Sequence, residues 1–260
     1  MIDTRVRLLE CPFEVRSELR DAANENGYRI GPEEAAGWLF FRSASAPGEI
    51  ALAATSAKMA GPFFLSVEHS GAAQELKEER AAPHARGHAA AFAITTREAL
   101  FEAVRAVYRF SKSLPTFPYE EFVRETAHLG DTEAERAQKV RIGQDRFRAA
   151  LIEYWKGVCP LTGISNIELL RASHIIPWKD CENDQERLNV YNGLLLSSLW
   201  DAAFDSGLIS FDDLGRVIKS PVIDQPAAEA LQAEAVPALE LTDQHRVRLA
   251  WHRCNRWQSE

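Results

Sequence analysis

The chain has 260 residues, of which 46% are hydrophobic and 26% charged, and its formal net charge is -8. This is ordinary globular composition, which excludes a collagen-like, low-complexity or wholly disordered chain. No run of about 18 apolar residues occurs, so no segment is expected to span a bilayer.

The first ten residues mix acidic and basic side chains without an apolar stretch, so we do not expect a secretory signal. The four cysteines are scattered and form no CxxC pair. This usage favours a reduced, cytoplasmic protein without a disulfide framework.

Residues 1–118 are predicted to form an α+β domain. Apolar runs predict four short strands, at residues 37–41, 50–53, 62–67 and 89–94. Apolar residues at helical spacing predict helices at residues 14–26 and 96–114. The polar stretch 74–87 is expected to be a mobile surface loop, with a short helix as the alternative. Four aromatic residues are interpreted as core, with a ligand pocket as the alternative: Trp38, Phe40, Phe63 and Phe64.

A boundary is predicted near residue 118, because two prolines fall within residues 113–118. Residues 119–156 are predicted to be a helical connector, with helices at residues 120–128 and 132–155. The second helix leads into a turn-rich segment that begins a third region, residues 157–260.

The charge of the chain is unevenly distributed. The net charge alone argues against a nucleic-acid partner, yet residues 136–180 hold eight basic and four acidic residues. A terminal helix is predicted at residues 241–257, and residues 245–257 hold four arginines and no acid. By charge alone these are solvated helix faces, and contact with a phosphate backbone is the alternative. His245 and His252 are interpreted as part of this solvated basic face, with metal binding as the alternative.

The residues with the clearest chemical pattern lie between 170 and 211. If residues 194–204 form a helix, Asp201 and Asp205 project from one face, one turn apart. Two such carboxylates repel each other unless a cation lies between them, and hard oxygen ligands favour Mg²⁺ or Mn²⁺. His174 lies in an extended segment that ends at Pro177. A neutral imidazole beside a carboxylate-bound metal ion can support phosphodiester hydrolysis.

The order His174, Asn192 and, nine positions later, Asp201 resembles the HNH endonucleases, which have a ββα-metal fold. The frame LLRASHIIPW … NGLLLSSLWDAAFDSGLISF, within residues 141–220, is similar to the HNH branch common in bacterial restriction-type proteins. The resemblance implies an α+β chain with a C-terminal ββα-metal HNH module. It also implies that His174 is the general base, that Asn192 holds the hairpin, and that Asp201 and Asp205 bind the metal ion.

The chain departs from the family pattern at two positions. Many HNH enzymes have an aspartate or histidine ligand just before the general base, where this chain has Ser173, and the final histidine is replaced by Asp201. Many members also hold a structural zinc with two CxxC pairs. Since residues 141–220 have only Cys159 and Cys181, no structural zinc is expected.

Together these patterns predict a DNA endonuclease that uses one divalent ion, Mg²⁺ or Mn²⁺. Four basic residues are predicted to contact the DNA: Arg141, Arg148, Arg171 and Lys179. The resemblance further implies a recognition domain at residues 1–118 and a role in modification-dependent restriction or defence. A homodimer is expected, because one HNH site cuts one strand. Two alternatives stay open: a degenerate HNH-fold DNA-binding or sensor protein, and a toxin nuclease.

Overall fold

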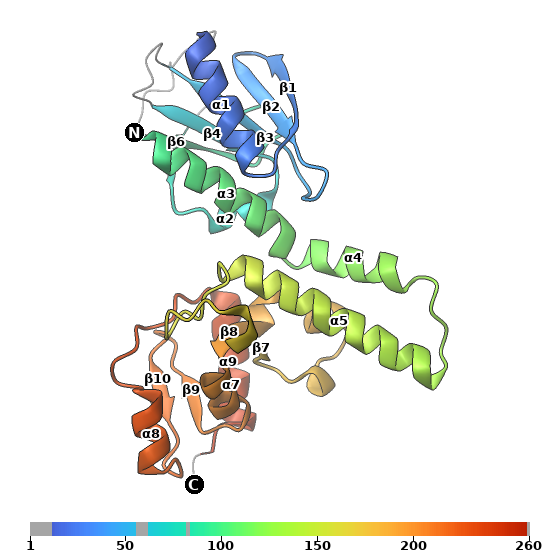
Figure 1. The fold of residues 1–260 in the computed structure, drawn as a ribbon, viewed down its shortest axis with the longest axis vertical. Coiled ribbons are helices and arrows are strands. Elements are labelled where there is room, and N and C mark those ends of the chain that lie inside the picture. Colours follow the sequence, from blue (N-terminus) through green and yellow to red (C-terminus); the bar gives the residue numbers. More distant parts are fainter. Residues whose placement is uncertain (1–11, 56–61, 82–83, 259–260) are drawn as a thin grey trace. The chain divides into compact units, whose positions relative to one another are not determined.

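The computed structural model describes residues 12–55, 62–81 and 84–258. The chain forms two compact units, Met1–Lys112 and Ser113–Glu260, each of which is described by itself (Figure 1). The division falls before Pro115, ahead of the predicted boundary at residue 118, so the segment predicted as a connector belongs to the second unit. No helix in the described ranges is long and apolar enough to cross a membrane.

The first unit contains a six-stranded antiparallel sheet in the order β1-β2-β3-β4-β6-β5. The strands are β1 Ile30–Ala35, β2 Trp38–Arg42, β3 Ile50–Ala54, β4 Phe63–Val67, β5 Glu79–Ala81 and β6 Ala90–Ile94. The four strands predicted from apolar runs are confirmed as β2, β3, β4 and β6. The two predicted helices are confirmed as α1 (Phe13–Glu25) and α3 (Arg97–Ser113).

Both faces of this sheet are buried. Apolar residues of α1 and α3, such as Leu19 and Val104, pack with one face in a single cluster. The other face has a second cluster of small residues around Trp38 and Phe64. Trp38, Phe63 and Phe64 are at most 3% exposed and Phe40 is partly buried, which confirms their interpretation as core residues.

The sequence reading missed the two edge strands. The prediction of a loop over residues 74–87 is wrong at β5, and α2 (Ser70–Glu75) also reaches into that stretch. Edge strands face solvent, so β1 and β5 lack the apolar run that marks a buried strand. In addition, β1 contains Gly31 and Pro32 at a register shift, which the sequence signals as a turn.

The second unit begins with a helical hairpin of α4 (Thr116–Thr126) and α5 (Glu133–Tyr154), as Figure 1 shows. These helices confirm the predictions at residues 120–128 and 132–155, although α4 begins earlier. Thr132 and Glu135 form a capping box that satisfies free N–H groups at the first turn of α5. The C-terminal half of α5 packs on β7 (Leu170–His174) and β8 (Gly193–Ser197).

β7 and β8 form an antiparallel hairpin, and α7 (Ser198–Asp205) follows β8 directly and packs against both strands. This ββα unit contradicts the predicted helix at residues 194–204, because residues 194–197 belong to β8. All five residues of β8 are buried. A short apolar run buried on both faces has no periodicity that separates a strand from a helix.

The rest of the second unit is built from short elements. A second hairpin, β9 (Ile209–Phe211) and β10 (Val217–Lys219), precedes α8 (Gln225–Leu231) and α9 (Asp243–Asn255). The terminal helix predicted at residues 241–257 is therefore confirmed as α9. Between β7 and β8 lie α6 (Asp184–Arg187) and three-residue helical turns at Trp178–Asp180 and Val190–Asn192.

Candidate active site

His174 is the last residue of β7 and pairs with Gly193, the first residue of β8. The ring of Phe147, from α5, stacks on the imidazole with the ring centroids 3.7 Å apart and the planes 16° apart. Trp178 packs edge-on against it at 5.6 Å. A Cβ atom at Gly193 would lie 2.5 Å from the Phe147 ring. Only glycine therefore lets α5 bring Phe147 onto His174 without displacement.

The imidazole of His174 is fixed in one tautomer. Its Nε2 lies 2.9 Å from the carbonyl oxygen of Arg187. Because a carbonyl oxygen only accepts, Nε2 holds the proton and donates it, and Nδ1 keeps its lone pair. No other described residue forms a hydrogen bond with Nδ1. Burial lowers the pKa of His174 to about 4, partly opposed by the Arg187 carbonyl and by the Asp205 carboxylate. The ring is therefore neutral at pH 7 and able to accept a proton.

Asn192 is fully buried beneath the turn that follows His174. Its Oδ1 accepts the Ile176 N–H at 2.8 Å, and its Nδ2 donates to the Ile176 carbonyl at 3.1 Å. Nδ2 also lies 3.4 Å from the Glu186 carbonyl oxygen, while the Asn192 backbone oxygen accepts the Ile175 N–H. Asn192 thus fixes the backbone on both sides of the loop that holds His174.

Asp201 and Asp205 lie one turn apart on α7. The pKa of Asp201 is raised by burial, with a further contribution from the Asp205 carboxylate. A hydrogen bond from the Ser173 side chain and the positive charge of Arg171 act in the opposite direction. Ser173 stands where many HNH enzymes have a further metal ligand. Its side chain is buried and contacts Asp201.

Burial and, to a smaller extent, repulsion by Asp205 raise the pKa of Asp201, and a hard divalent cation between the two acids would remove that repulsion. Within the residues that the structure describes, no group of three or more His, Cys, Asp or Glu side chains is arranged to hold a metal ion. The chain thus supplies two carboxylates here, and the remaining ligands of a bound ion would come from water and substrate.

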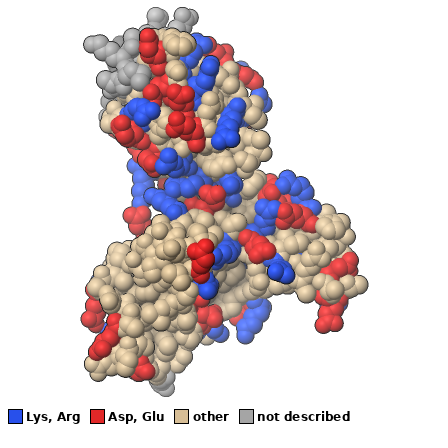
Figure 2. Space-filling model, viewed as in Figure 1, with Lys and Arg blue, Asp and Glu red and all other residues tan. Residues whose placement is uncertain are grey.

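The four basic residues predicted to contact DNA form no ion pair in the described part of the chain, although the charge of Arg171 acts on the Asp201 carboxylate. Arg148 donates to the Ile167 and Leu170 carbonyls, and Arg171 donates to the Glu168 and Leu170 carbonyls. Arg141 and Lys179 are exposed. Other cations of this stretch are neutralised, for example Arg146 by Glu125. Figure 2 accordingly shows acidic and basic side chains intermixed on this unit.

The interpretation of α9 as a solvated basic face is wrong. His245 and His252 are 0% and 2% exposed. Each of the four arginines faces a carboxylate: Arg246 and Asp243, Arg248 and Glu186, Arg253 and Asp213, Arg256 and Asp205. A helix that packs both histidines inward and pairs its arginines within the unit has little free charge for a phosphate backbone.

The sequence reading missed Phe147, Arg187 and Gly193 as residues that shape the site. The Arg187 side chain bonds the Trp178 and Cys181 carbonyls and Asp184, which folds the 178–187 loop so that the Arg187 carbonyl faces His174. Contacts of this kind join distant segments and leave no local pattern in the sequence.

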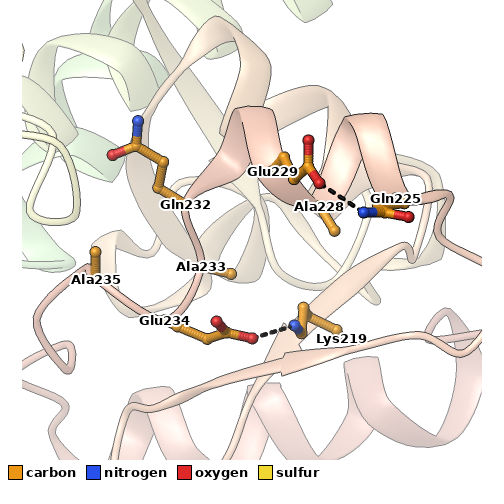
Figure 3. Close-up of a pocket in the computed structure, with 8 residues that line it drawn as sticks. All are labelled: Lys219, Gln225, Ala228, Glu229, Gln232, Ala233, Glu234 and Ala235. Atoms are coloured by element: carbon orange, nitrogen blue, oxygen red, sulfur yellow. Dashed lines mark hydrogen bonds and ion pairs between the residues drawn. The ribbon is translucent and has the colours of Figure 1, made fainter.

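A separate pocket of about 320 Å³ lies between β10 and α8 (Figure 3). Its polar side chains pair with one another: Lys219 with Glu234, and Gln225 with Glu229. None of the predicted site residues lines it, so it carries no part of the chemistry described above.

Residues 159–212 match the family model described as HNH endonuclease. This segment includes β7, β8, α7 and β9, with His174, Asn192, Asp201 and Asp205. The chain therefore carries an HNH endonuclease domain, which implies a phosphodiester hydrolase with a nucleic-acid substrate, and HNH nucleases generally use a divalent metal. No match was found among curated proteins.

Proposed function

We propose that this chain is a DNA endonuclease in which His174 is the general base. The observation that carries the proposal is the imidazole itself, with Nε2 held by the Arg187 carbonyl and the Nδ1 lone pair free. Asp205 is the last residue of α7, the helix that also carries Asp201, and its charge acts to raise the pKa of this imidazole.

In the proposed reaction, Nδ1 of His174 accepts a proton from the water that attacks the scissile phosphate. Asp201 and Asp205 would hold one Mg²⁺ or Mn²⁺ ion. When bound, such an ion neutralises charge on the phosphate and the leaving 3′ oxygen. Arg141, Arg148 and Lys179 supply positive charge for the DNA backbone, because none of them forms an ion pair in the described residues, and Arg171 adds charge beside Asp201. Asn192 and Arg187 keep the base in place.

The test is nicking of supercoiled plasmid by the purified protein with Mg²⁺ or Mn²⁺. We expect His174→Ala to lower the rate by about 10²- to 10⁴-fold, since general-base catalysis contributes that much. His128→Ala, a change of an exposed histidine in the same unit, is the matched control and should nick like the wild type. Nicking that survives in His174→Ala would remove His174 from the role of base.

The first unit is proposed to recognise a feature of foreign DNA, which would make the protein a modification-dependent restriction or defence enzyme. Its separate core ahead of the HNH domain supports this role. Cleavage of plasmids that carry different base modifications tests it, and dependence on one modification is the expected result. Equal cleavage of all plasmids, with toxicity on expression that His174→Ala relieves, would favour a toxin nuclease instead.

A second candidate function is nucleic-acid binding by a catalytically degenerate HNH fold. The observation that favours it is Ser173, which leaves two carboxylates where many HNH enzymes have a further ligand. Calorimetric titration with Mn²⁺ separates the two functions. An active site should bind Mn²⁺ in a manner that Asp201→Ala abolishes, whereas a degenerate site should bind none.

A further inference from the structure

The helix α9 and the residues after it, up to Gln258, contact both halves of the candidate active site. All of them lie beyond the segment that matches the HNH family. One set of contacts reaches the loop that orients His174, and the other reaches the end of α7 that carries Asp205. We call residues 243–258 the C-terminal brace.

The first set of contacts centres on Arg248 and Glu186. The Arg248 Nε and Nη2 atoms lie 2.8 Å and 2.9 Å from the two carboxylate oxygens of Glu186. The side chains are 12% and 25% exposed, so this bidentate pair is shielded from solvent more than the other ion pairs of α9. Fork-like pairs of this geometry fix orientation as well as distance.

Glu186 lies next to the atoms that orient the base. Its own carbonyl oxygen accepts a hydrogen bond from Asn192, and the carbonyl oxygen of the next residue, Arg187, accepts the proton of His174 Nε2. His245, also on α9, packs edge-on against Tyr191, the neighbour of Asn192, at 5.3 Å. The backbone that determines the His174 tautomer is therefore attached to α9.

The second set of contacts satisfies the C-terminal end of α7, where helix carbonyls lack partners within the helix. His252 Nε2 donates to the Phe204 carbonyl at 3.2 Å, and its ring stacks on Phe204 at 4.0 Å. Arg256 donates to the Asp205 carbonyl at 2.7 Å and lies 4.0 Å from its carboxylate. The Gln258 N–H donates to the Gly207 carbonyl. Asp205 is thus held by the same brace.

We infer that Arg248, through Glu186, is a positioning residue for the general base. This inference rests on the proposed function of His174. Loss of the bidentate pair frees α6, so the Arg187 carbonyl no longer holds Nε2–H and the Nδ1–H tautomer becomes populated. With its proton on Nδ1, the ring has no lone pair on that nitrogen, so Nδ1 cannot accept a proton from the attacking water.

The first measurement is ¹⁵N-edited NMR of the imidazoles at pH 7 in the full chain, without metal or DNA. The His174 signals are assigned by their absence in His174→Ala. The wild type should show the Nε2–H tautomer alone, whereas Arg248→Gln and Glu186→Gln should show a mixture. Arg253→Gln is the matched control, because it removes another paired arginine of the same helix, one that bonds Phe211 and Asp213 instead of the loop that holds Arg187.

The second measurement is plasmid nicking. Arg248→Gln and Glu186→Gln should each lower kcat by about 10- to 100-fold with KM nearly unchanged, as expected for misplacement of a catalytic group. The double variant should lose no more than either single variant, because both changes break one contact. A wild-type tautomer and wild-type kcat in Arg248→Gln would overturn the inference.

Two further outcomes keep the tests separate. If Arg248→Gln does not fold, Arg248→Lys takes its place, because lysine keeps the positive charge but cannot form the bidentate pair with Glu186. The Nε2–H tautomer alone in Arg248→Lys would then overturn the inference. If the wild type does not nick DNA but Arg248→Gln still changes the His174 tautomer, the proposed function fails while the positioning role of Arg248 stands.

Discussion

Ser173 is the residue in this site whose substitution tests the metal centre most directly. It is 4% exposed and hydrogen-bonds Asp201, next to the base. A hydroxyl at this place neutralises no charge, so the positive charge near the two acids of α7 comes from Arg171 beside Asp201 and Arg256 beside Asp205.

We expect Ser173→Asp to lower the melting temperature in EDTA and to restore it in Mn²⁺. A third buried carboxylate adds repulsion when no cation is bound and adds a ligand when one is. The free-energy penalty in EDTA should be about 1–3 kcal/mol. Thermal denaturation with EDTA or Mn²⁺ measures both effects, and Ser173→Ala is the control without an added charge. Identical melting in the two solutions would contradict a cation site at Asp201 and Asp205.

Asn192 is expected to be the most costly asparagine of the hairpin to replace. Asn192→Ala removes a buried side chain that accepts the Ile176 N–H and donates to the Ile176 carbonyl, which should lower the free energy of unfolding by about 2–4 kcal/mol. Asn189→Ala is the matched control. That side chain is half-buried and accepts one N–H, from Tyr191, so its loss should cost about 1 kcal/mol. Urea denaturation compares them, and equal losses would argue against a special role for Asn192.

At the scale of elements, the contact between α5 and the ββα hairpin decides how the base is covered. Phe147 and Leu151 of α5 approach Gly193 so closely that a Cβ atom there would lie within 2.7 Å of both. Gly143 of the same helix accommodates the Trp178 ring in a similar way. The close packing of α5 against the residues around His174 therefore depends on two glycines, Gly143 in α5 and Gly193 in β8.

Gly193→Ala should push α5 away and lower the free energy of unfolding by about 1–3 kcal/mol, the usual cost of overpacking. Nicking should fall as well, because Phe147 would no longer cover the imidazole. Gly130→Ala is the control, since its Cβ would meet only the flexible carboxylate end of Glu135. Chemical denaturation and plasmid assays measure the two effects. A Gly193→Ala protein as stable and as active as Gly130→Ala would show that α5 adapts freely.

Local patterns in the sequence were enough to place most of these elements. His174 does lie in an extended strand, and Asp201 and Asp205 do share one helix, because residue spacing within one element survives folding. The start of that helix was wrong, because β8 is buried on both faces and has no alternating pattern. The inward histidines of α9 were also misread, since a histidine that stacks on Phe204 looks like any basic residue in the sequence.

Two histidines of the second unit, His245 and His252, are buried in their neutral form. Burial lowers the pKa of His245 to about 3, with Arg248 and Arg246 acting in the same direction, and burial lowers that of His252 to about 4. An unfolded histidine titrates near pH 6.5. Between these values the unfolded chain binds more protons than the folded chain, so the free energy of unfolding rises with pH and reaches its full value above about 6.5.

Acidification from pH 6.5 to pH 4.5 should therefore destabilise the protein, by at most about 1.4 kcal/mol per pH unit for each such histidine. His245→Phe should reduce this pH dependence by about one proton, although it also loses the capping contact with Thr242. Urea denaturation at several pH values gives the slope for both proteins. An unchanged slope in His245→Phe would mean that His245 is not buried in neutral form.

The C-terminal brace also has a consequence for protein engineering. A designer who transplants this nuclease onto another scaffold by excising only the matched residues, 159–212, would expose Phe204 and leave the Glu186 carboxylate without its guanidinium. The ring face of His174 would open to water as well, because Phe147 lies upstream of the excised piece. The piece to transplant is therefore the whole second unit, Ser113–Glu260, in which the hairpin keeps the helices that enclose it.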